Sequence, residues 1–398
     1  MHFISAIIPI LALAGSVSSH PGELEEHGTP AKREFLGFAE RSIAGCKDQL
    51  VARGHEKRAI ARRTALAENL RRKRGLPVKR DLASVLATDH KSNATGLTAN
   101  STAAEIFTGS LNCVLQPEVT IGPYWVSGEL IRANMIEEQE GVPLYADIQI
   151  IDVSTCEPIS DVYLDAWHAN STGVYSGVVA SGNGNMNDAS NINATFLRGI
   201  TKTDSNGVAY FETLVPGHYT GRASHMHVMA TLNATVNSNN TLLGGHVSHV
   251  GQVFLDQDLL TSVGTVSPYS TNTQDVTLNS ADTILAEEAA SMDPFLQYVL
   301  LGSDVSEGVL AWISIGIDST QNYTTSAAAT LTDHGGVANA NSGAGGMGGS
   351  PPTDGNSTTP SNSTASSSAS AAAASSSSSA SQNGVSALLG LFAFVWAM

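Results

Sequence analysis

The sequence predicts an all-β fold, a β-sandwich, with a helical segment before it and a disordered tail after it. Short runs rich in β-branched and aromatic residues follow one another closely, and turn residues such as Asn206-Gly207 and Pro216-Gly217 separate them. No strong helical pattern lies between these runs, which favours packed sheets over alternating strands and helices. The runs are ADIQIIDV, VYLDAWHA, GVAYFETL, SHMHVMATL, HVGQVFL and GVLAWISIGID.

The segments on either side of this predicted domain, which we place at residues 105–325, differ from it in composition. Residues 20–88 are basic and rich in helix formers, and they predict one or two helices broken near Gly54. Residues 89–104 are a polar linker. Residues 326–384 are rich in Ser, Ala, Thr and Gly and nearly lack large apolar side chains, so we expect them to be disordered.

Both ends of the chain have features of targeting signals. Residues 1–19 contain an apolar run followed by small residues, as in a cleaved signal peptide. Residues 385–398 are apolar and follow a polar spacer, which is typical of a GPI-anchor signal. Together with Asn-x-Ser/Thr sequons, these features predict a secreted or cell-surface, N-glycosylated protein. The sequons begin at Asn93, Asn100, Asn170, Asn193, Asn233, Asn239, Asn322, Asn356 and Asn362.

Charge and cysteine content narrow the possible partners and the compartment. The formal net charge of −16 argues against nucleic acid as a partner, because phosphate binding needs a basic face. Three cysteines allow one disulfide in an oxidising compartment. We expect it between Cys113 and Cys156, which both lie in the strand-rich region, and this pairing leaves Cys46 without a role.

The stretch GHYTGRASHMHV, residues 217–228, predicts a metal site. On a β-strand His225 and His227 point to the same face. Tyr219 lies just upstream, and Tyr175 follows another predicted strand and a glycine turn. If the four side chains converge, they offer two imidazoles and two phenols, a set unusual for zinc. Phenolate is a hard ligand that ionises beside a strongly Lewis-acidic cation, so this set favours Fe(III).

A longer set of motifs resembles a known family. The segments GPYWVSGEL, YLDAWHANSTGVYSG, FLRGITKTDSNGVAYFETLVPGHYTGRASHMHV and GQVFLD resemble, in the same order, the intradiol ring-cleavage dioxygenases of the catechol and protocatechuate type. They look most like the secreted fungal members. The resemblance covers residues 122–256 and implies the same β-sandwich that the strand pattern predicts.

The resemblance also implies the residues and the reaction. It assigns one non-haem Fe(III) ion to Tyr175, Tyr219, His225 and His227. It places Arg222 and Gln252 beside the substrate, and Pro123 and Tyr124 in the pocket lining. It implies that an aromatic 1,2-diol such as catechol, hydroxyquinol or a larger polyphenol binds the iron while Tyr219 leaves it and accepts a proton. O2 is then inserted between the two hydroxylated carbons, which gives a muconate-type diacid.

Two alternatives stay open on the sequence. One is a non-catalytic cell-wall or adhesion module that keeps only the sandwich. The other is a copper or zinc metalloenzyme that uses His225, His227 and a nearby histidine. We expect His168 to pack or hydrogen-bond, His218 to be solvated, and His246 and His249 to lie outside the ligand set. The Asn/Gly-rich stretch after Tyr175 is expected near the mouth of the pocket.

Overall fold

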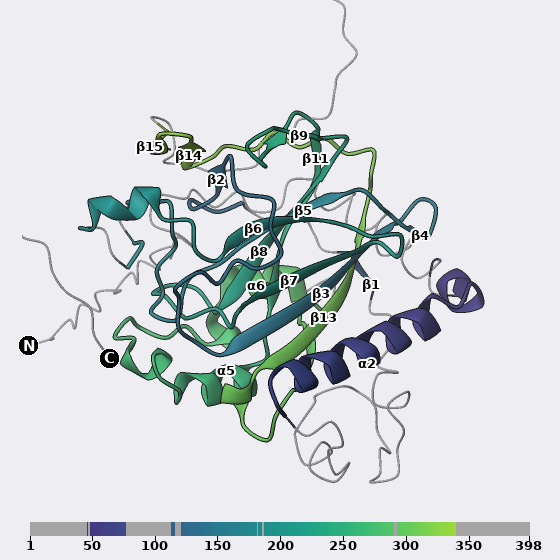
Figure 1. Cartoon of the computed structure of the whole chain (residues 1–398), viewed down its shortest axis with the longest axis horizontal. Helices are drawn as coiled ribbons and strands as arrows, with labels where there is room; N and C mark the ends of the chain where they lie inside the picture. The colour runs from purple at the N-terminus through teal and green to yellow at the C-terminus, as the bar shows by residue number, and fades with distance from the viewer. Residues whose placement is uncertain are drawn as a thin grey trace, which may run out of the picture. The chain divides into compact units, whose positions relative to one another are not determined.

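The fold is described from a computed structural model, in which residues 46, 48–76, 113–115, 121–180, 182–184, 187–289 and 293–339 are placed (Figure 1). All of them belong to the first of two units of the chain, Met1–Ser350. The predicted signal peptide, linker and GPI signal lie outside the described residues, and so does the tail beyond residue 339. None of the helices in the described part has the length and apolar content that crossing a bilayer requires.

The larger sheet has six strands and is mixed. Its central strands, β3 (Pro143–Asp152) and β13 (Val309–Ile317), run parallel to each other along their whole length. β7 (Val208–Leu214) and β4 (Glu157–Pro158) pair antiparallel with β3. β12 (Gln297–Leu300) pairs antiparallel with β13, and β1 (Cys113–Leu115) pairs parallel with it.

The smaller sheet has four antiparallel strands in the order β11-β8-β5-β6. These are β11 (His246–Phe254), β8 (His225–Leu232), β5 (Tyr163–Trp167) and β6 (Arg198–Lys202). The turn at Asn206-Gly207 joins β6 to β7 and therefore carries the chain from this sheet to the larger one. Gly207 has φ 72°, in the left-handed region where a glycine is least strained.

The main core lies between the two sheets and consists of alternate residues of their strands. Met226 and Val228 of β8 and Leu164 and Ala166 of β5 pack there against apolar residues of β3 and β13, such as Ile148. The intervening residues of the small sheet face the other way. This two-layer arrangement of sheets confirms the predicted all-β sandwich. It also leaves the outer face of the small sheet available for a site.

Short elements complete the described fold. β14 (Ala329–Thr332) pairs with β15 (Gly335–Ala338) and with β2 (Val126–Ser127), and β9 (Thr235–Val236) pairs with β10 (Leu242–Leu243). The fold therefore continues past residue 325, where we had placed the start of the tail. The short helices are α5 (Gln257–Gly264), α6 (Thr283–Ala289), and the 3-10 helices Ala189–Asn193, Tyr269–Thr271, Asn279–Ala281 and Val305–Glu307.

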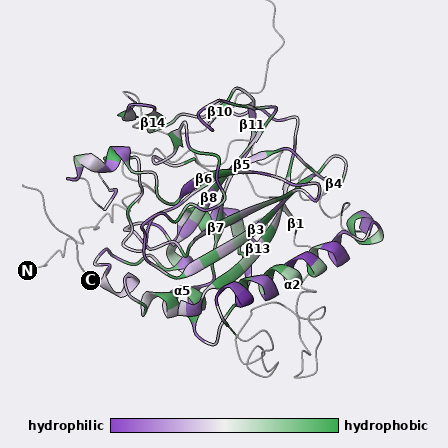
Figure 2. Ribbon diagram, in the orientation of Figure 1, coloured by the Kyte–Doolittle hydropathy of each residue, from purple (hydrophilic) through white to green (hydrophobic). Residues whose placement is uncertain are grey.

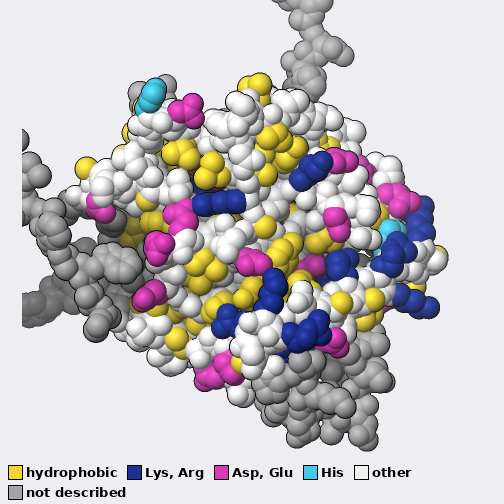
Figure 3. Space-filling model, in the orientation of Figure 1, with side chains coloured by type: hydrophobic (Ala, Val, Ile, Leu, Met, Phe, Trp, Pro, Cys, Tyr) yellow, Lys and Arg dark blue, Asp and Glu magenta, His cyan; other side chains and the backbone are white. Residues whose placement is uncertain are grey.

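Helix α2 (His55–Lys73) packs on the larger sheet. Ala67 and Leu70 contact Val299 of β12 and Trp312 of β13 in a separate apolar cluster. Gly54, with φ 70°, ends the helical stretch before it, as the sequence predicts. Figure 2 shows hydrophobic and hydrophilic residues along this helix, and Figure 3 shows Lys and Arg side chains gathered over the region where it lies. The described part of the basic segment, residues 48–76, thus packs against the larger sheet as part of the fold.

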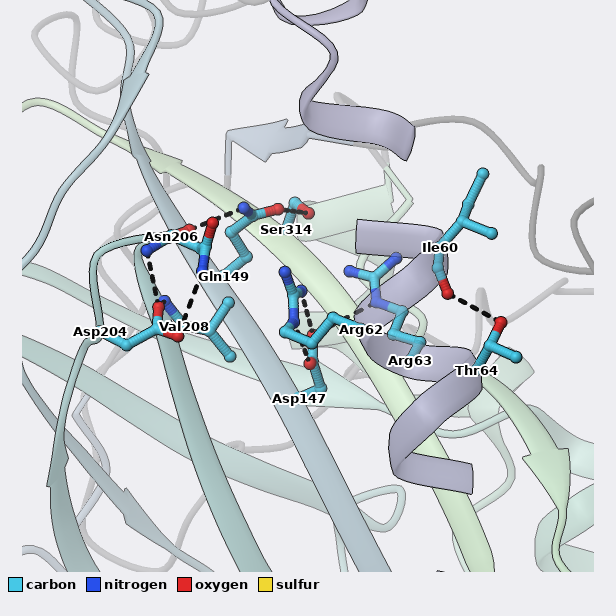
Figure 4. Close-up of polar contacts among 10 residues, drawn as sticks. All are labelled: Ile60, Arg62, Arg63, Thr64, Asp147, Gln149, Asp204, Asn206, Val208 and Ser314. Carbon is cyan, nitrogen blue, oxygen red and sulfur yellow. Dashed lines mark hydrogen bonds and ion pairs between the residues drawn. The ribbon is translucent and has the colours of Figure 1, made fainter. Parts of the chain in front are cut away.

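An ion cluster fixes α2 to the sheet (Figure 4). The Asp147 carboxylate of β3 accepts hydrogen bonds from Arg62 at 2.9 Å and from Arg63 at 3.2 Å. Burial alone would raise the pKa of Asp147, but the charges of Arg63 and Arg62 outweigh it and hold this pKa below its usual value. We call these three residues the Asp147 cluster.

The disulfide differs from the one we expected. Cys46 pairs with Cys156, across 110 residues, and ties the segment before α2 to the turn between β3 and β4. The predicted Cys113–Cys156 bridge is therefore wrong. Both Cys46 and Cys156 are buried against Leu50 and Ile151. Only one of the two cysteines, Cys156, lies in the sandwich, because its partner Cys46 comes from the helical segment, which the strand pattern does not include.

Candidate metal centre

Four side chains meet on the outer face of the small sheet. The Oη atoms of Tyr175 and Tyr219 each lie 3.5 Å from His225 Nε2, and His227 Nε2 lies 3.0 Å from the same atom. The sequence brings these side chains together by three routes: the two histidines from β8, Tyr219 from the turn that leads into it, and Tyr175 from the loop after β5. All four are buried. We call this group the metal pocket.

The strand and its neighbours fix the two imidazoles. His225 Nδ1 lies 2.6 Å from the Ala223 carbonyl oxygen. A carbonyl only accepts, so Nδ1 carries the proton and the Nε2 lone pair of His225 faces the pocket. The His227 ring stacks on Trp167, with centroids 4.8 Å apart and an angle of 4° between the planes. Both rings are therefore held in one orientation.

Burial favours the neutral forms of the side chains in the metal pocket when no cation is bound. It raises the pKa of Tyr175 to about 12. Burial, and then the nearby Tyr175, raise the pKa of Tyr219 well above its usual value, while burial and His225 lower the pKa of His227 far below its usual value. A cation in this pocket must displace the phenol protons, so its affinity should increase with pH.

The donor set fits a trivalent cation better than zinc or copper. Two phenol oxygens and two imidazole nitrogens converge on a volume small enough for one ion, and a hard oxyanion matches Fe(III). Across the residues that the structure describes, no three His, Cys, Asp or Glu side chains come together to hold a metal. Among the described residues, the zinc or copper alternative therefore lacks a third His, Cys or carboxylate ligand at this pair of histidines.

Arg222 and Gln252 lie together beside the pocket. Arg222 Nη2 donates to Gln252 Oε1 at 2.6 Å, and Gln252 is the cross-strand partner of His227. Arg222 Nε also donates to Asp282 Oδ2 at 2.8 Å, in an ion pair that is fully buried. Asp282, which we did not predict, caps α6 by accepting from the Leu285 N–H at 2.8 Å. Its position immediately before a helix is the one feature of the local sequence that could have pointed to Asp282.

Comparisons with known proteins identify this region. Residues 122–241 match the family model described as Dioxygenase. This part of the chain is a dioxygenase domain. It includes Tyr175, Tyr219, His225 and His227, whereas Gln252 lies beyond the match. The resemblance to the intradiol ring-cleavage dioxygenases that the motifs predict is thereby confirmed, and the protein is an oxygenase.

Solved structures are also similar to about half of the chain. An intradiol ring-cleavage dioxygenase from Tetranychus urticae has 27% identity and a TM-score of 0.44, and the match covers 53% of this chain and 97% of that one. The dioxygenase domain of a carbohydrate-binding fusion protein from Streptomyces sp. SirexAA-E has 21% identity and a TM-score of 0.33, with 50% and 97% covered. Catechol 1,2-dioxygenase from Pseudomonas arvilla C-1 has 16% identity and a TM-score of 0.32, with 51% and 62% covered. A search of curated proteins found no match.

Tyr124 forms one wall of the metal pocket in the dioxygenase domain. Its buried ring lies 4.7 Å from the ring of Tyr175 and 6.3 Å from that of Tyr219, measured between centroids. Pro123, next to it, is half-buried. Of the two residues that the resemblance places in the lining, Tyr124 thus lies at the metal pocket, and Pro123 precedes it in the chain.

Arg198 of β6 joins two segments of the dioxygenase domain and is a residue that we did not single out. It donates to the Tyr124 carbonyl at 2.6 Å and to the Ser176 carbonyl at 2.9 Å, and it forms a buried ion pair with Glu129. Glu129 in turn interacts electrostatically with Asp165. Burial, and then the charge of Glu129, raise the pKa of Asp165 well above its usual value. Arg198 thereby holds the Tyr124 segment against the loop that contains Tyr175.

The other histidines of this region lie outside the four-residue group. His168 is buried between the Ala169 carbonyl, at 2.8 Å, and Thr213 Oγ1, at 2.7 Å, as predicted. His218 was expected in solvent, but it is half-buried and its Nε2 lies 3.0 Å from the Gln274 carbonyl oxygen. His246 Nε2 lies 3.3 Å from the Ser319 carbonyl oxygen, and His249 is buried in β11.

Proposed function

We propose that this protein is a non-haem Fe(III) intradiol dioxygenase that inserts O2 between the two hydroxylated carbons of an aromatic 1,2-diol and yields a muconate-type diacid. The observation that carries the proposal is the convergence of two phenol oxygens and one imidazole nitrogen on His225 Nε2, within 3.0 to 3.5 Å. Both oxygen atoms of O2 enter the product, so the reaction balances without a reductant.

Tyr175, Tyr219, His225 and His227 would hold the iron. Bound there, Fe(III) would supply the Lewis acidity that ionises the diol and draws electron density from its ring. The chain's own contribution to the proton balance comes from Tyr219. Burial raises the pKa of Tyr219 well above its usual value, so a phenolate at this position would be a strong base for the proton of the diol.

The turn that carries Tyr219 suits this role. Thr220 is exposed, and Gly221 has φ 94° with no atom within 4 Å of the position that a Cβ would occupy. Tyr219 therefore stands next to a stretch of chain that has room to move. Tyr175 lies in a tightly bonded loop and is suited to staying in place.

Arg222 and Gln252 would act on the substrate. Burial raises the pKa of both Tyr175 and Tyr219, and the Arg222 guanidinium, a buried, fixed cation, partly offsets that rise. A cation held in place by Asp282 and Gln252 can stabilise negative charge that develops on the diol ring without reorganising. The apolar and aromatic residues around the metal pocket, among them Tyr124 and Trp167, exclude water from it.

Iron analysis and oxygen uptake test this proposal together. The purified protein should contain one iron per chain, absorb visible light through tyrosinate-to-Fe(III) charge transfer, and consume O2 with catechol, hydroxyquinol or a larger polyphenol. The products should be ring-opened diacids, without hydrogen peroxide. A colourless protein that takes up zinc or copper in place of iron, or uptake that requires an added reductant, would contradict the proposal.

A matched pair of variants makes the test specific. Tyr175→Phe should remove the colour and the oxygen uptake. Tyr269→Phe removes the hydroxyl of another buried tyrosine, which donates to the Val215 carbonyl at 2.7 Å in the main core, and it should keep both. Equal loss in the two variants would show that the effect is on folding.

We also propose that the protein is exported and N-glycosylated, of the secreted fungal type, possessing a GPI anchor. The disulfide between Cys46 and Cys156 supports export, because such bridges persist in oxidising compartments. The test is to express the chain in a eukaryotic host and to treat the cell-surface fraction with a glycosidase and with a phospholipase that cleaves GPI anchors. Recovery of the whole protein, without glycans, in the cytosol would overturn this proposal.

A further inference from the structure

The loop after Tyr175, which we expect near the mouth of the pocket, directs part of its side chains inward. It contributes two asparagines, Asn183 and Asn191, whose side chains are 2% and 4% exposed. Asn191 belongs to the 3-10 helix Ala189–Asn193. Amide side chains are rarely buried unless their hydrogen bonds are satisfied, so their partners indicate what the two residues do.

Both amides bind the main chain of Tyr175. Asn183 Oδ1 accepts from the Tyr175 N–H at 2.8 Å, and Asn183 Nδ2 donates to the Tyr175 carbonyl at 2.8 Å. Asn191 Nδ2 donates to the same carbonyl at 2.8 Å. Both asparagines also donate to the Val178 carbonyl, at 2.9 Å and 2.7 Å. The two side chains thus satisfy the main-chain N–H and carbonyl of Tyr175, as the main chain of a neighbouring strand does for a residue in a β-sheet.

The other tyrosine of the pocket is held differently. The Arg222 N–H lies 3.5 Å from the Tyr219 carbonyl, at the long end of the hydrogen-bond range. The residues on either side of Tyr219 form hydrogen bonds with side-chain amides. Asn272 donates to the His218 carbonyl at 2.7 Å, and the Thr220 N–H lies 3.4 Å from Gln274 Oε1. The short hydrogen bonds from Asn183 and Asn191 are made to the main chain of Tyr175 itself.

We propose that Asn183 and Asn191 are positioning residues that fix the Tyr175 phenol in the metal pocket and thereby slow the loss of the metal. This inference rests on the proposed function. A ligand atom is placed no better than the main chain that carries it, and metal sites depend on neighbouring hydrogen bonds that hold the ligands in position. Asn183 and Asn191 supply these bonds from a loop whose composition alone resembles a flexible connection.

The experiment compares three substitutions of the same chemistry. Asn183→Asp and Asn191→Asp keep the side-chain shape but remove the N–H donors to the Tyr175 carbonyl. Gln149→Glu is the control: Gln149 is 2% exposed, lies in the larger sheet, and donates to the Asn206 carbonyl at 2.8 Å (Figure 4). Each variant loses a buried amide donor to a main-chain carbonyl and buries a carboxylate, so their effects on folding should be similar.

The rate of Fe(III) release to a chelator is the first readout. We expect it to rise about tenfold in each asparagine variant, as the loss of a buried hydrogen bond predicts, with a shift of the visible band. Gln149→Glu should leave both unchanged. The proposal is overturned if the asparagine variants release iron no faster than Gln149→Glu.

Hydrogen exchange of the Tyr175 amide, measured on metal-free protein, is the second readout. It should be faster in Asn191→Asp than in the wild-type protein, and unchanged in Gln149→Glu. Asn183→Asp keeps the Oδ1 acceptor of this amide, so its exchange should change less. Unchanged exchange in Asn191→Asp would overturn the positioning role. If the wild-type protein takes up no Fe(III), the proposed function fails, and the exchange rates still decide whether the two asparagines hold Tyr175.

Discussion

The metal pocket and the Asp147 cluster are both buried groups of polar side chains, but they differ in how their charges are matched. In the Asp147 cluster one carboxylate receives hydrogen bonds from two guanidinium groups of α2, so the chain provides both signs of charge. In the metal pocket two phenols and two imidazoles bring their lone pairs together. The nearest cation of the chain, Arg222, is bonded to Asp282 and Gln252.

This difference separates a cluster that stabilises the fold from one that is suited to bind a cation. A complete ion cluster gains nothing from a further ion, and removing one partner leaves an uncompensated buried charge. A set of converging lone pairs loses little stability when one of them is removed, but it loses the geometry that a metal needs. Substitutions in the two places should therefore have opposite effects on activity and stability.

The largest effect is expected from Tyr175→Phe or His227→Ala in the metal pocket. Oxygen uptake with a diol should fall by about a thousandfold or more, because a metal ion supplies several kcal/mol of the barrier reduction. The free energy of unfolding of metal-free Tyr175→Phe should change little, because the ring is kept and no charged partner is left behind. Oxygen-electrode assays and denaturant unfolding measure the two. A loss of activity accompanied by an equal loss of folded protein would remove the contrast.

Asp147→Asn should have the reverse effect. It leaves Arg62 and Arg63 without their counter-charge, and we expect a loss of about 3 to 4 kcal/mol in the free energy of unfolding, measured by urea denaturation. Oxygen uptake per folded molecule should stay unchanged. A large drop in the iron content of the folded fraction would mean that the helix and the pocket are coupled.

His168 is a third buried polar site, and its effect should appear in the pH dependence of the free energy of unfolding. Burial lowers its pKa from 6.5 to about 4. Because the folded-state pKa is the lower one, this contribution to stability is complete above pH 6.5 and is lost as the pH falls toward 4. It amounts to about 3 kcal/mol. The unfolding free energy of metal-free His168→Gln should fall less over this range than that of the wild type, and parallel curves would contradict the assignment.

A smaller loss of turnover than for the metal-pocket variants is expected from Asp282→Asn. The substitution keeps an acceptor for Arg222 but removes the charge that orients it, so we expect kcat to fall about tenfold with little change in iron content. Asp256→Asn is the matched control, since Asp256 caps α5 by accepting from the Leu259 N–H at 2.7 Å. Equal losses of kcat in both variants would assign the effect to helix capping.

The sequence predicted those parts of the site that depend on local periodicity. The alternation along SHMHVMATL places His225 and His227 on one face, and the structure has Met226 and Val228 in the core on the other. The sandwich follows from the same kind of pattern, since each predicted run contains or overlaps a strand. The prediction that Tyr175 and Tyr219 lie close to these histidines depended on the family resemblance.

The parts that the sequence did not predict depend on contacts between distant residues. Arg222 and Asp282 are 60 positions apart, and Cys46 and Cys156 are 110 apart, so no local pattern links them. Asn183 and Asn191 lie in a stretch whose composition is that of a surface loop, and only the fold shows that their amides point inward. The docking of α2 was missed because its charges were considered without Asp147.

A crystal structure of the protein grown with Fe(III), with data collected at the iron absorption edge, tests the central claim most directly. The account predicts one anomalous peak per chain, within coordination distance of the Oη atoms of Tyr175 and Tyr219 and the Nε2 atoms of His225 and His227. A peak bound by the two histidines without either tyrosine, or a peak elsewhere in the chain, would contradict it.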